Sequence, residues 1–275
     1  MNQIKLKGQP GIMACTVTDI PAFPGESFTI AYPEAIGDVA QPFWFGSIKP
    51  RWEERENGIL VSTGEQPGEL SYEMTVTPGV DSVRADFKLT NHGRNIWKQG
   101  MAFNCFQCGA APSIRDHDCL RHWVRVGGEF KCLREIPRIF GPRPAIQLYS
   151  VEGAPLGKDL PFVAAFETTP DVVIEPWMAI RSRDDKKMVA TVSKPGLFLF
   201  QNREYSCIHC GTGFGEVKPG QTATAVNKVY FVESTLAEWH QRMESEFDGG
   251  TTTTGKIATP HFGKDSPSSS PTAPL

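Results

Sequence analysis

The stretch "VKPGQTATAVNKVYFV" (residues 217–232) decides the fold class of this chain. Its Pro-Gly pair at 219–220 predicts a tight turn, because proline fixes φ and glycine can take the positive φ that a type II turn requires. After the turn, apolar and polar residues alternate, which is the period of a strand with one buried face. We therefore predict a long strand whose buried face carries Ala223, Ala225, Val229 and Phe231.

The same signals recur along the chain. The segments "YEMTVTP" (72–78) and "VRADFKLT" (83–90) flank a "GVDS" turn and predict a hairpin. Three more short segments are typical of strands: "FVAAFE" (162–167), "KMVATVS" (187–193) and "LFLFQ" (197–201). Pro195 and Gly196, between the last two, predict another type II turn. So many short strands between turns predict an all-β protein, an antiparallel β-sandwich of stacked sheets.

A single helix is predicted near the end of the sandwich, in "STLAEWHQRMESEF" (234–247). Thr235 and Glu238 form a capping box, in which each side chain accepts a hydrogen bond from the other's backbone. His240 and Glu244 follow at a spacing of four, which can hold a metal but is more typical of a solvated helix face.

The domain boundary is predicted at the end of this helix. Residues 1–247 form one sandwich domain, and 248–275 are a Thr/Ser/Pro/Gly-rich tail that is too poor in large apolar groups to be ordered. We expect no function from His261 in this tail. Near the N-terminus, Phe43, Trp44 and Trp52 lie among prolines and predict either a packed loop or a platform for a flat ligand.

Composition excludes several classes of protein. The net charge is −3 and both signs are interspersed, so nucleic acid is not an expected partner. No segment is apolar enough for a membrane span or a secretory signal. We expect a cytoplasmic protein that binds a small molecule or an oligosaccharide, or a secreted one if a signal has been lost. Nothing in the sequence specifies the oligomeric state.

Seven cysteines are present, and four of them form two C-x-x-C-G motifs. These four are Cys105, Cys108, Cys207 and Cys210. Two such knuckles can complete a tetrahedral Cys₄ zinc site, although the pairs lie much farther apart than the roughly 15–20 residues of a zinc ribbon. Alternatively, the thiols are small core residues of two strands. A redox motif is disfavoured because neither pair begins a helix.

Two further neighbourhoods carry polar chemistry. The segment "SIRDHDCLRHW" (113–123) contains Asp116, His117 and Arg121, which together can move a proton and bind a carboxylate or hydroxyl, or can form ordinary solvated surface. His209 lies at a strand end before the glycines of "GTGFG" (211–215). Its ring can enter a cleft with a pKa near neutrality, or can bond to a nearby carbonyl.

The late strand (217–232), "FKLTNHGRNIW" (87–97) and "APSIRDHDCLRHWV" (111–124) resemble the galactose mutarotase-like supersandwich proteins. The resemblance covers about residues 70–247. Members of this fold group include sugar epimerases, polysaccharide lyases and carbohydrate-binding domains. In the epimerases, a histidine acid and a glutamate base work on either side of the anomeric carbon.

We therefore expect a carbohydrate-active protein that acts on a sugar or uronic acid by acid–base chemistry, in the manner of an epimerase or a lyase. His209 is the expected acid or base, Asp116 its partner and Arg121 the clamp. Further substrate contacts are expected from His117, Trp177, Arg181 and Glu175. No cofactor is required. The alternative is a non-catalytic carbohydrate-binding or interaction domain with a structural Cys₄ zinc.

Overall fold

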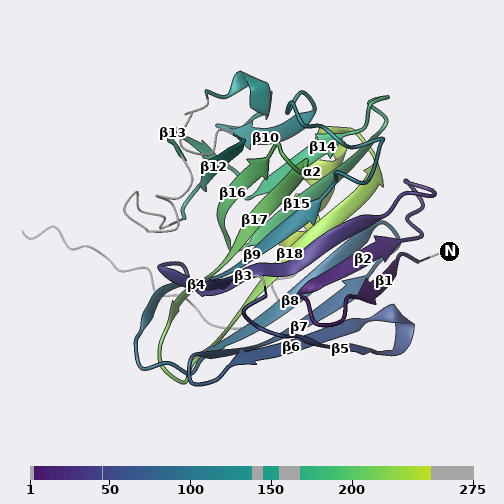
Figure 1. The fold of residues 1–275 in the computed structure, drawn as a ribbon. Coiled ribbons are helices and arrows are strands. Elements are labelled where there is room, and N and C mark those ends of the chain that lie inside the picture. Colours follow the sequence, from purple (N-terminus) through teal and green to yellow (C-terminus); the bar gives the residue numbers. More distant parts are fainter. Residues whose placement is uncertain (1–2, 45, 138–144, 155–167, 249–275) are drawn as a thin grey trace, which may run out of the picture. The chain divides into compact units, whose positions relative to one another are not determined.

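The computed structural model describes residues 3–44, 46–137, 145–154 and 168–248 (Figure 1). The expected strand at 162–167 and the tail with His261 lie outside these residues. The chain divides into two compact units, residues 1–239 and 240–275. The first unit contains all the strands that the structure describes.

Two nine-stranded sheets make up the first unit. Sheet A has the order β1 (Lys5–Gly8), β2 (Ala14–Thr18), β3 (Phe28–Asp38), β9 (Trp97–Gln107), β17 (Cys207–Val217), β16 (Gly196–Asn202), β12 (Ile146–Val151) and β13 (Thr168–Ile174), with β4 (Gln41–Trp44) paired to β3. Sheet B has the order β11 (Glu129–Cys132), β10 (His122–Val126), β14 (Trp177–Arg181), β15 (Lys187–Lys194), β18 (Thr222–Glu233), β8 (Ser82–Asn91), β7 (Leu70–Pro78), β6 (Leu60–Gln66) and β5 (Arg51–Glu54). Two short 3₁₀ turns, η1 (Glu56–Gly58) and η2 (Leu133–Glu135), also belong to the first unit.

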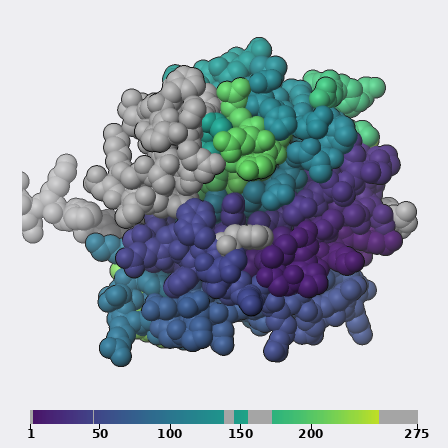
Figure 2. Space-filling model, in the orientation of Figure 1, coloured from purple at the N-terminus to yellow at the C-terminus, as the bar shows by residue number. Residues whose placement is uncertain are grey.

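Antiparallel pairing joins the described strands throughout, except between β12 and β13, which are parallel. The expected hairpin is present as β7 and β8, with Tyr72 opposite Leu89. The predicted all-β sandwich is therefore confirmed. In Figure 2, the surface of the N-terminal strands (purple) and that of the segment near residue 200 (green) lie on one face of the protein.

The main core fills the space between the sheets. On β18, Ala225, Val229 and Phe231 are buried there, which confirms the predicted apolar face. A second apolar layer covers the opposite face of sheet A, because β9 and β16 carry large side chains on both faces. Its members are Ala35, Val39, Met101, Phe103, Ile146, Leu148, Leu197, Phe198 and Phe200.

The chain passes between the two sheets several times, and two of these connections contain the predicted Pro-Gly turns. Between β17 and β18, Gly220 has a φ of +76° and the Gln221 amide donates to the Lys218 carbonyl at 2.9 Å, which confirms the predicted turn. Between β15 and β16, the predicted type II turn is wrong: the Lys194–Pro195 peptide is cis, and Gly196 does not have a positive φ. Glycine is needed at 196 for a close approach, since a Cβ there would lie 2.2 Å from Cβ of Pro176.

The predicted helix is present as α2 (Leu236–Asp248), and its capping box is confirmed. The Glu238 amide donates to the Thr235 hydroxyl at 3.2 Å, and the Thr235 amide donates to the Glu238 carboxylate at 3.0 Å. Farther along, His240 Nδ1 lies 3.3 Å from Glu244 Oε2, so the two residues form an ion pair when the imidazole is protonated. Among the residues that the structure describes, no helix is both long and apolar enough to span a membrane.

Candidate functional site

His209 lies in β17, in the middle of sheet A. It pairs with Cys105 of β9 on one side and with Phe200 of β16 on the other. Its ring stacks on Phe200 at a centroid distance of 3.7 Å and on Phe103 at 5.1 Å. Because side chains alternate along a strand, His209 points away from the inter-sheet core and belongs to the second apolar layer. Only 2% of the residue is exposed.

Polar contacts fix the orientation of this imidazole. Nδ1 lies 3.3 Å from the carbonyl oxygen of Phe200, which can only accept a hydrogen bond, so Nδ1 carries a proton. Nε2 lies 3.4 Å from Oε2 of Glu34 and 3.6 Å from Sγ of Cys207. Nε2 is therefore the atom that faces the acidic and thiol groups of the site.

The charge states of His209 and Glu34 support each other. Burial lowers the pKa of His209, but the neighbouring Cys105 and Glu34 outweigh it and raise this pKa to about 9. Burial raises the pKa of Glu34, but the hydrogen bond and charge of His209 outweigh it and lower this pKa below its usual value. At neutral pH, an imidazolium therefore faces a carboxylate.

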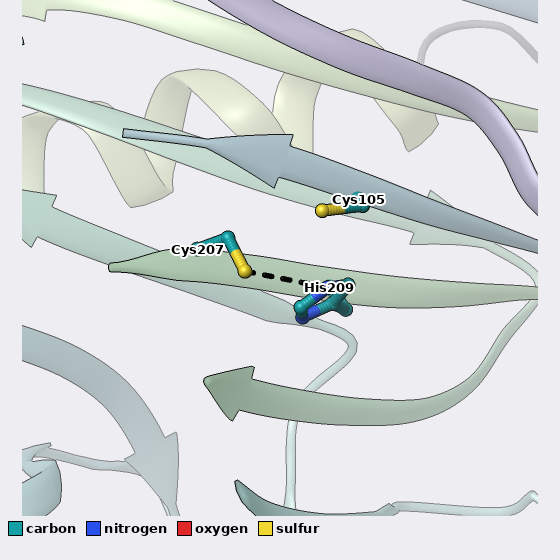
Figure 3. A group of neighbouring side chains, drawn as sticks. All are labelled: Cys105, Cys207 and His209. Atoms are coloured by element: carbon teal, nitrogen blue, oxygen red, sulfur yellow. Dashed lines mark hydrogen bonds between the residues drawn. The ribbon is translucent and has the colours of Figure 1, made fainter. Parts of the chain in front are cut away.

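Two cysteines lie beside Nε2. Cys105 and Cys207 come from the neighbouring strands β9 and β17, and Figure 3 shows their sulfur atoms turned toward each other and toward the imidazole. The two sulfur atoms and one ring nitrogen of His209 all lie within 4.8 Å of one another. A hydrogen bond with Cys207, together with burial, raises the pKa of Cys105 well above its usual value.

A cavity of about 450 Å³ opens above these groups. Its lining combines aromatic, amide, thiol and charged side chains: Glu34, Trp44, Phe103, Cys105, Gln107, Ile146, Phe200, Asn202, Tyr205, Cys207 and His209. Trp44 is 39% exposed and Tyr205 is 64% exposed, so both rings are accessible to a ligand. The lining contains the features expected of a small-molecule site, namely apolar walls and a few polar groups that fix orientation.

The segment 113–123 contacts the residues just before β17. The Asp116 amide donates to the Ser206 hydroxyl at 2.8 Å, and Nδ1 of His117 lies 2.6 Å from the carbonyl oxygen of Arg203. The Asp116 carboxylate, however, accepts hydrogen bonds from the Arg121 amide at 2.7 Å and from His122 at 2.8 Å. Asp116 is therefore part of a buried pair with His122, and it is not among the described residues that line the cavity.

Arg121 holds the backbone of its own segment. Its guanidinium donates to the carbonyls of Ser113, Ile114, Arg115 and Arg181, at distances from 2.5 to 3.3 Å. These bonds use the donors that a clamp for a carboxylate would need. The structure therefore gives Arg121 a role in folding the segment, away from the cavity lining.

The other expected substrate contacts lie at β14 of sheet B, away from the cavity in sheet A. Trp177 is fully buried, so its ring offers no face to a sugar, and its Nε1 donates to Glu175 at 3.0 Å. Glu175 also pairs with Arg125 at 3.1 Å. Arg181 donates to Asp185 at 2.6 Å and to the Ser234 carbonyl at 2.7 Å. These side chains stabilise sheet B and its loops.

The four paired cysteines do not converge on one point. Cys105 and Cys207 lie in the cavity, whereas Cys108 and Cys210 belong to the core between the sheets. In β17 the reason is the alternation of side chains, which puts 207 and 209 on one face and 208 and 210 on the other. The glycines of "GTGFG" (211–215) lie within β17, so the expectation that His209 is at a strand end before them is wrong.

Sequence reasoning missed Glu34, which lies in β3. The signal was a lone carboxylate in the otherwise apolar run "TIAYPEAIG" (29–37). Trp44 is one of the aromatic residues near the N-terminus that predict either a packed loop or a platform for a flat ligand. Its neighbour Trp52 instead donates to the carbonyl of Ile12 at 3.0 Å.

No protein-family model and no curated protein matches this sequence. Similar solved structures include a galactose mutarotase-like protein from Clostridium acetobutylicum, at 9% identity and a TM-score of 0.44, covering 84% of this chain and 98% of that one. Another from Lactobacillus casei has 9% identity and a TM-score of 0.43, covering 83% and 100%. An aldose epimerase homologue from C. elegans has 8% identity and a TM-score of 0.39, covering 85% and 99%.

Proposed function

We propose that this protein binds a sugar in the cavity over β17 and transfers a proton to or from it through His209. The observation that carries the proposal is the 3.4 Å contact between His209 Nε2 and Glu34 Oε2 in a cavity with accessible aromatic rings. An imidazole paired with a carboxylate is a common general acid or base, because the carboxylate orients the ring and offsets its charge.

The rest of the lining suits a sugar. Sugars have apolar C–H faces that pack on aromatic rings, and Trp44 and Tyr205 offer such rings. The amides of Gln107 and Asn202 each have donors and an acceptor, which matches the mixed character of sugar hydroxyls. The cavity volume of about 450 Å³ lies within the roughly 300–1,000 Å³ of small-molecule sites.

Glu34 is proposed as a positioning residue, with His209 as the catalytic residue. Because the carboxylate contacts Nε2 directly, the two groups lie on the same side of a bound sugar. This arrangement supports proton transfer at one position of the ring, such as opening of a hemiacetal by way of its hydroxyl. It differs from an acid and a base that work on opposite sides of the anomeric carbon.

The proposal is tested with single anomers of reducing sugars and uronic acids, whose optical rotation reports interconversion. We expect one sugar to equilibrate faster with the protein, and His209→Asn to lower the rate by about 10²–10⁴-fold. The control is His92→Asn, an exposed histidine that bonds to Ser71. Equal rates for His209→Asn and the unmodified protein would contradict the proposal. Saturable binding of a sugar without turnover would instead favour the non-catalytic binding domain.

A further inference from the structure

We propose that Cys105, Cys207 and His209 form a binding site for a thiophilic divalent cation, with Zn²⁺ the expected ion. Their two sulfur atoms and one ring nitrogen lie within 4.8 Å of one another on adjacent strands (Figure 3). Cysteine, histidine, aspartate and glutamate side chains can all bind a metal ion. Among the described residues, these three are the group of such side chains whose ligand atoms lie close enough together to hold one.

The distances suit zinc. Zn–S bonds of about 2.3 Å and Zn–N bonds of about 2.0–2.1 Å in a tetrahedron place a sulfur and a nitrogen ligand roughly 3.6 Å apart. The separation between Cys207 Sγ and His209 Nε2 is 3.6 Å. The ion therefore requires only a small adjustment of side chains that the sheet already holds in place.

The hydrogen bond on the far side of the ring also suits a metal. Histidines that bind zinc usually donate their other N–H to a carbonyl or carboxylate, which fixes the tautomer. His209 Nδ1 faces the Phe200 carbonyl at 3.3 Å, which leaves Nε2 for the ion. Glu34, 3.4 Å from Nε2, places a negative charge beside the site and favours a cation there.

Pairing in the sheet favours a metal over a disulfide. Cys207 pairs with Gln107, and Cys105 pairs with His209, so the two cysteines are diagonal neighbours on adjacent strands. Diagonal positions have Cα atoms about 7–8 Å apart, whereas a disulfide needs about 4.4–6.8 Å. A metal ion spans the wider gap without movement of the strands.

Binding of the ion releases protons. The thiols of Cys105 and Cys207 each lose their proton to water and become thiolate ligands, and any proton on Nε2 leaves as well. Three protein ligands leave one coordination position, and because all three residues line the cavity, we expect that position to accept a water or a small ligand. One consequence rests on the proposed function: a bound ion occupies the atom that would transfer the proton, so zinc would inhibit turnover.

The test uses reduced, metal-free full-length protein and Co²⁺ as a spectroscopic probe. We expect one Co²⁺ per chain, a thiolate-to-metal charge-transfer band, and displacement of the Co²⁺ by one equivalent of Zn²⁺. Cys105→Ser and Cys207→Ser should each weaken binding by more than about tenfold. The matched control is Cys108→Ala, a buried thiol of the same motif that faces the core and should leave binding unchanged.

A second measurement needs no variant. X-ray absorption of the zinc-loaded wild-type protein should give two sulfur ligands, with nitrogen or oxygen completing the shell. Four sulfur ligands, a shell without sulfur, or equal Co²⁺ affinity in folded Cys105→Ser would overturn the proposal. None of these readouts involves a sugar or turnover. A negative result for the metal site therefore leaves the proposed function standing, and a negative result in the sugar assays leaves the metal site standing.

Discussion

The hydroxyl of Tyr32 in sheet A donates a 2.8 Å hydrogen bond to Oδ1 of Asn227 in sheet B, across the interior of the sandwich. The Asn227 amide in turn donates to the Val192 carbonyl at 2.9 Å and lies 3.1 Å from the hydroxyls of Thr191 and Ser193. Both Tyr32 and Asn227 are fully buried. Asn227 is on the face of β18 that otherwise carries Ala225 and Val229, so a polar link replaces an apolar contact there.

Tyr32→Phe is expected to lower the free energy of unfolding by about 1–3 kcal/mol, because it leaves a buried amide oxygen without its donor. Urea unfolding followed by circular dichroism measures this change. Tyr205→Phe, whose parent residue is 64% exposed, should change stability far less. Equal effects of the two substitutions would show that the inter-sheet bond contributes little.

Arg121→Met should destabilise the protein by about 1.5–3 kcal/mol, since charged hydrogen bonds to the segment's carbonyls are lost. The expectation follows from the four carbonyls that the guanidinium contacts. Arg183→Met is the matched control, because its exposed side chain donates to the Pro112 carbonyl alone in the described contacts. A folded Arg121→Met protein with normal stability and no sugar turnover would instead restore Arg121 as a substrate clamp.

Acid stability should depend on Asp116. Burial raises the pKa of this carboxyl. The hydrogen bond and charge of His122, the hydrogen bond from the Arg121 amide and the charge of the Arg121 guanidinium outweigh burial and lower the pKa to about 2. A carboxyl whose pKa is depressed on folding stabilises the folded state above its unfolded pKa, here 3.8. This contribution is lost as pH falls from 3.8 towards about 2.

Asp116→Asn should therefore be less stable than the unmodified protein at pH 7, and the difference should shrink as pH falls through that window. Thermal unfolding at a series of pH values measures it. Asp118→Asn, at an exposed position that pairs with Arg203, should keep the unmodified pH dependence. A constant difference between pH 7 and pH 2 would exclude Asp116 as the titrating group.

The aromatic rim should control affinity for the sugar. Trp44→Ala and Tyr205→Ala are each expected to weaken binding by roughly tenfold, equivalent to about 1.4 kcal/mol, because they remove a ring against which the ligand packs. Calorimetric titration measures the affinity. Leu120→Ala removes a side chain that is 53% exposed and does not line the cavity, and should leave the affinity unchanged. Unchanged affinity in both aromatic variants would exclude the rim as a binding surface.

The fold was predictable because its signals are local. Alternation in β7, β8 and β18 and the turn at Pro219-Gly220 lie within single segments, and no distant information is needed to recognise them. The prediction at Pro195 is wrong because the Lys194–Pro195 peptide is cis and Gly196 does not have a positive φ. Gly196 instead lies against Pro176, a contact between distant residues that the local sequence does not indicate.

The site was only partly predictable because it depends on pairing between distant segments. His209 is a candidate that its own strand suggests, but Glu34 reaches it through the pairing of β3 with β9 and of β9 with β17. The register of β3 shifts between Ala31 and Ala35, and this irregularity surrounds Glu34. Asp116 and Arg121 had the right chemistry, but their contacts with neighbouring backbone cannot be recognised in the sequence.

The repeated crossing of the chain between the two sheets has a consequence for how it folds. Because β15 and β16 belong to different sheets, as do β17 and β18, neither sheet is made from one continuous length of chain. A nascent or truncated polypeptide that ends before residue 222 lacks the strand that joins β15 to β8. We expect assembly to be slow, as in other proteins dominated by non-local contacts, and the sandwich to become resistant to proteolysis only after its last strand has been made.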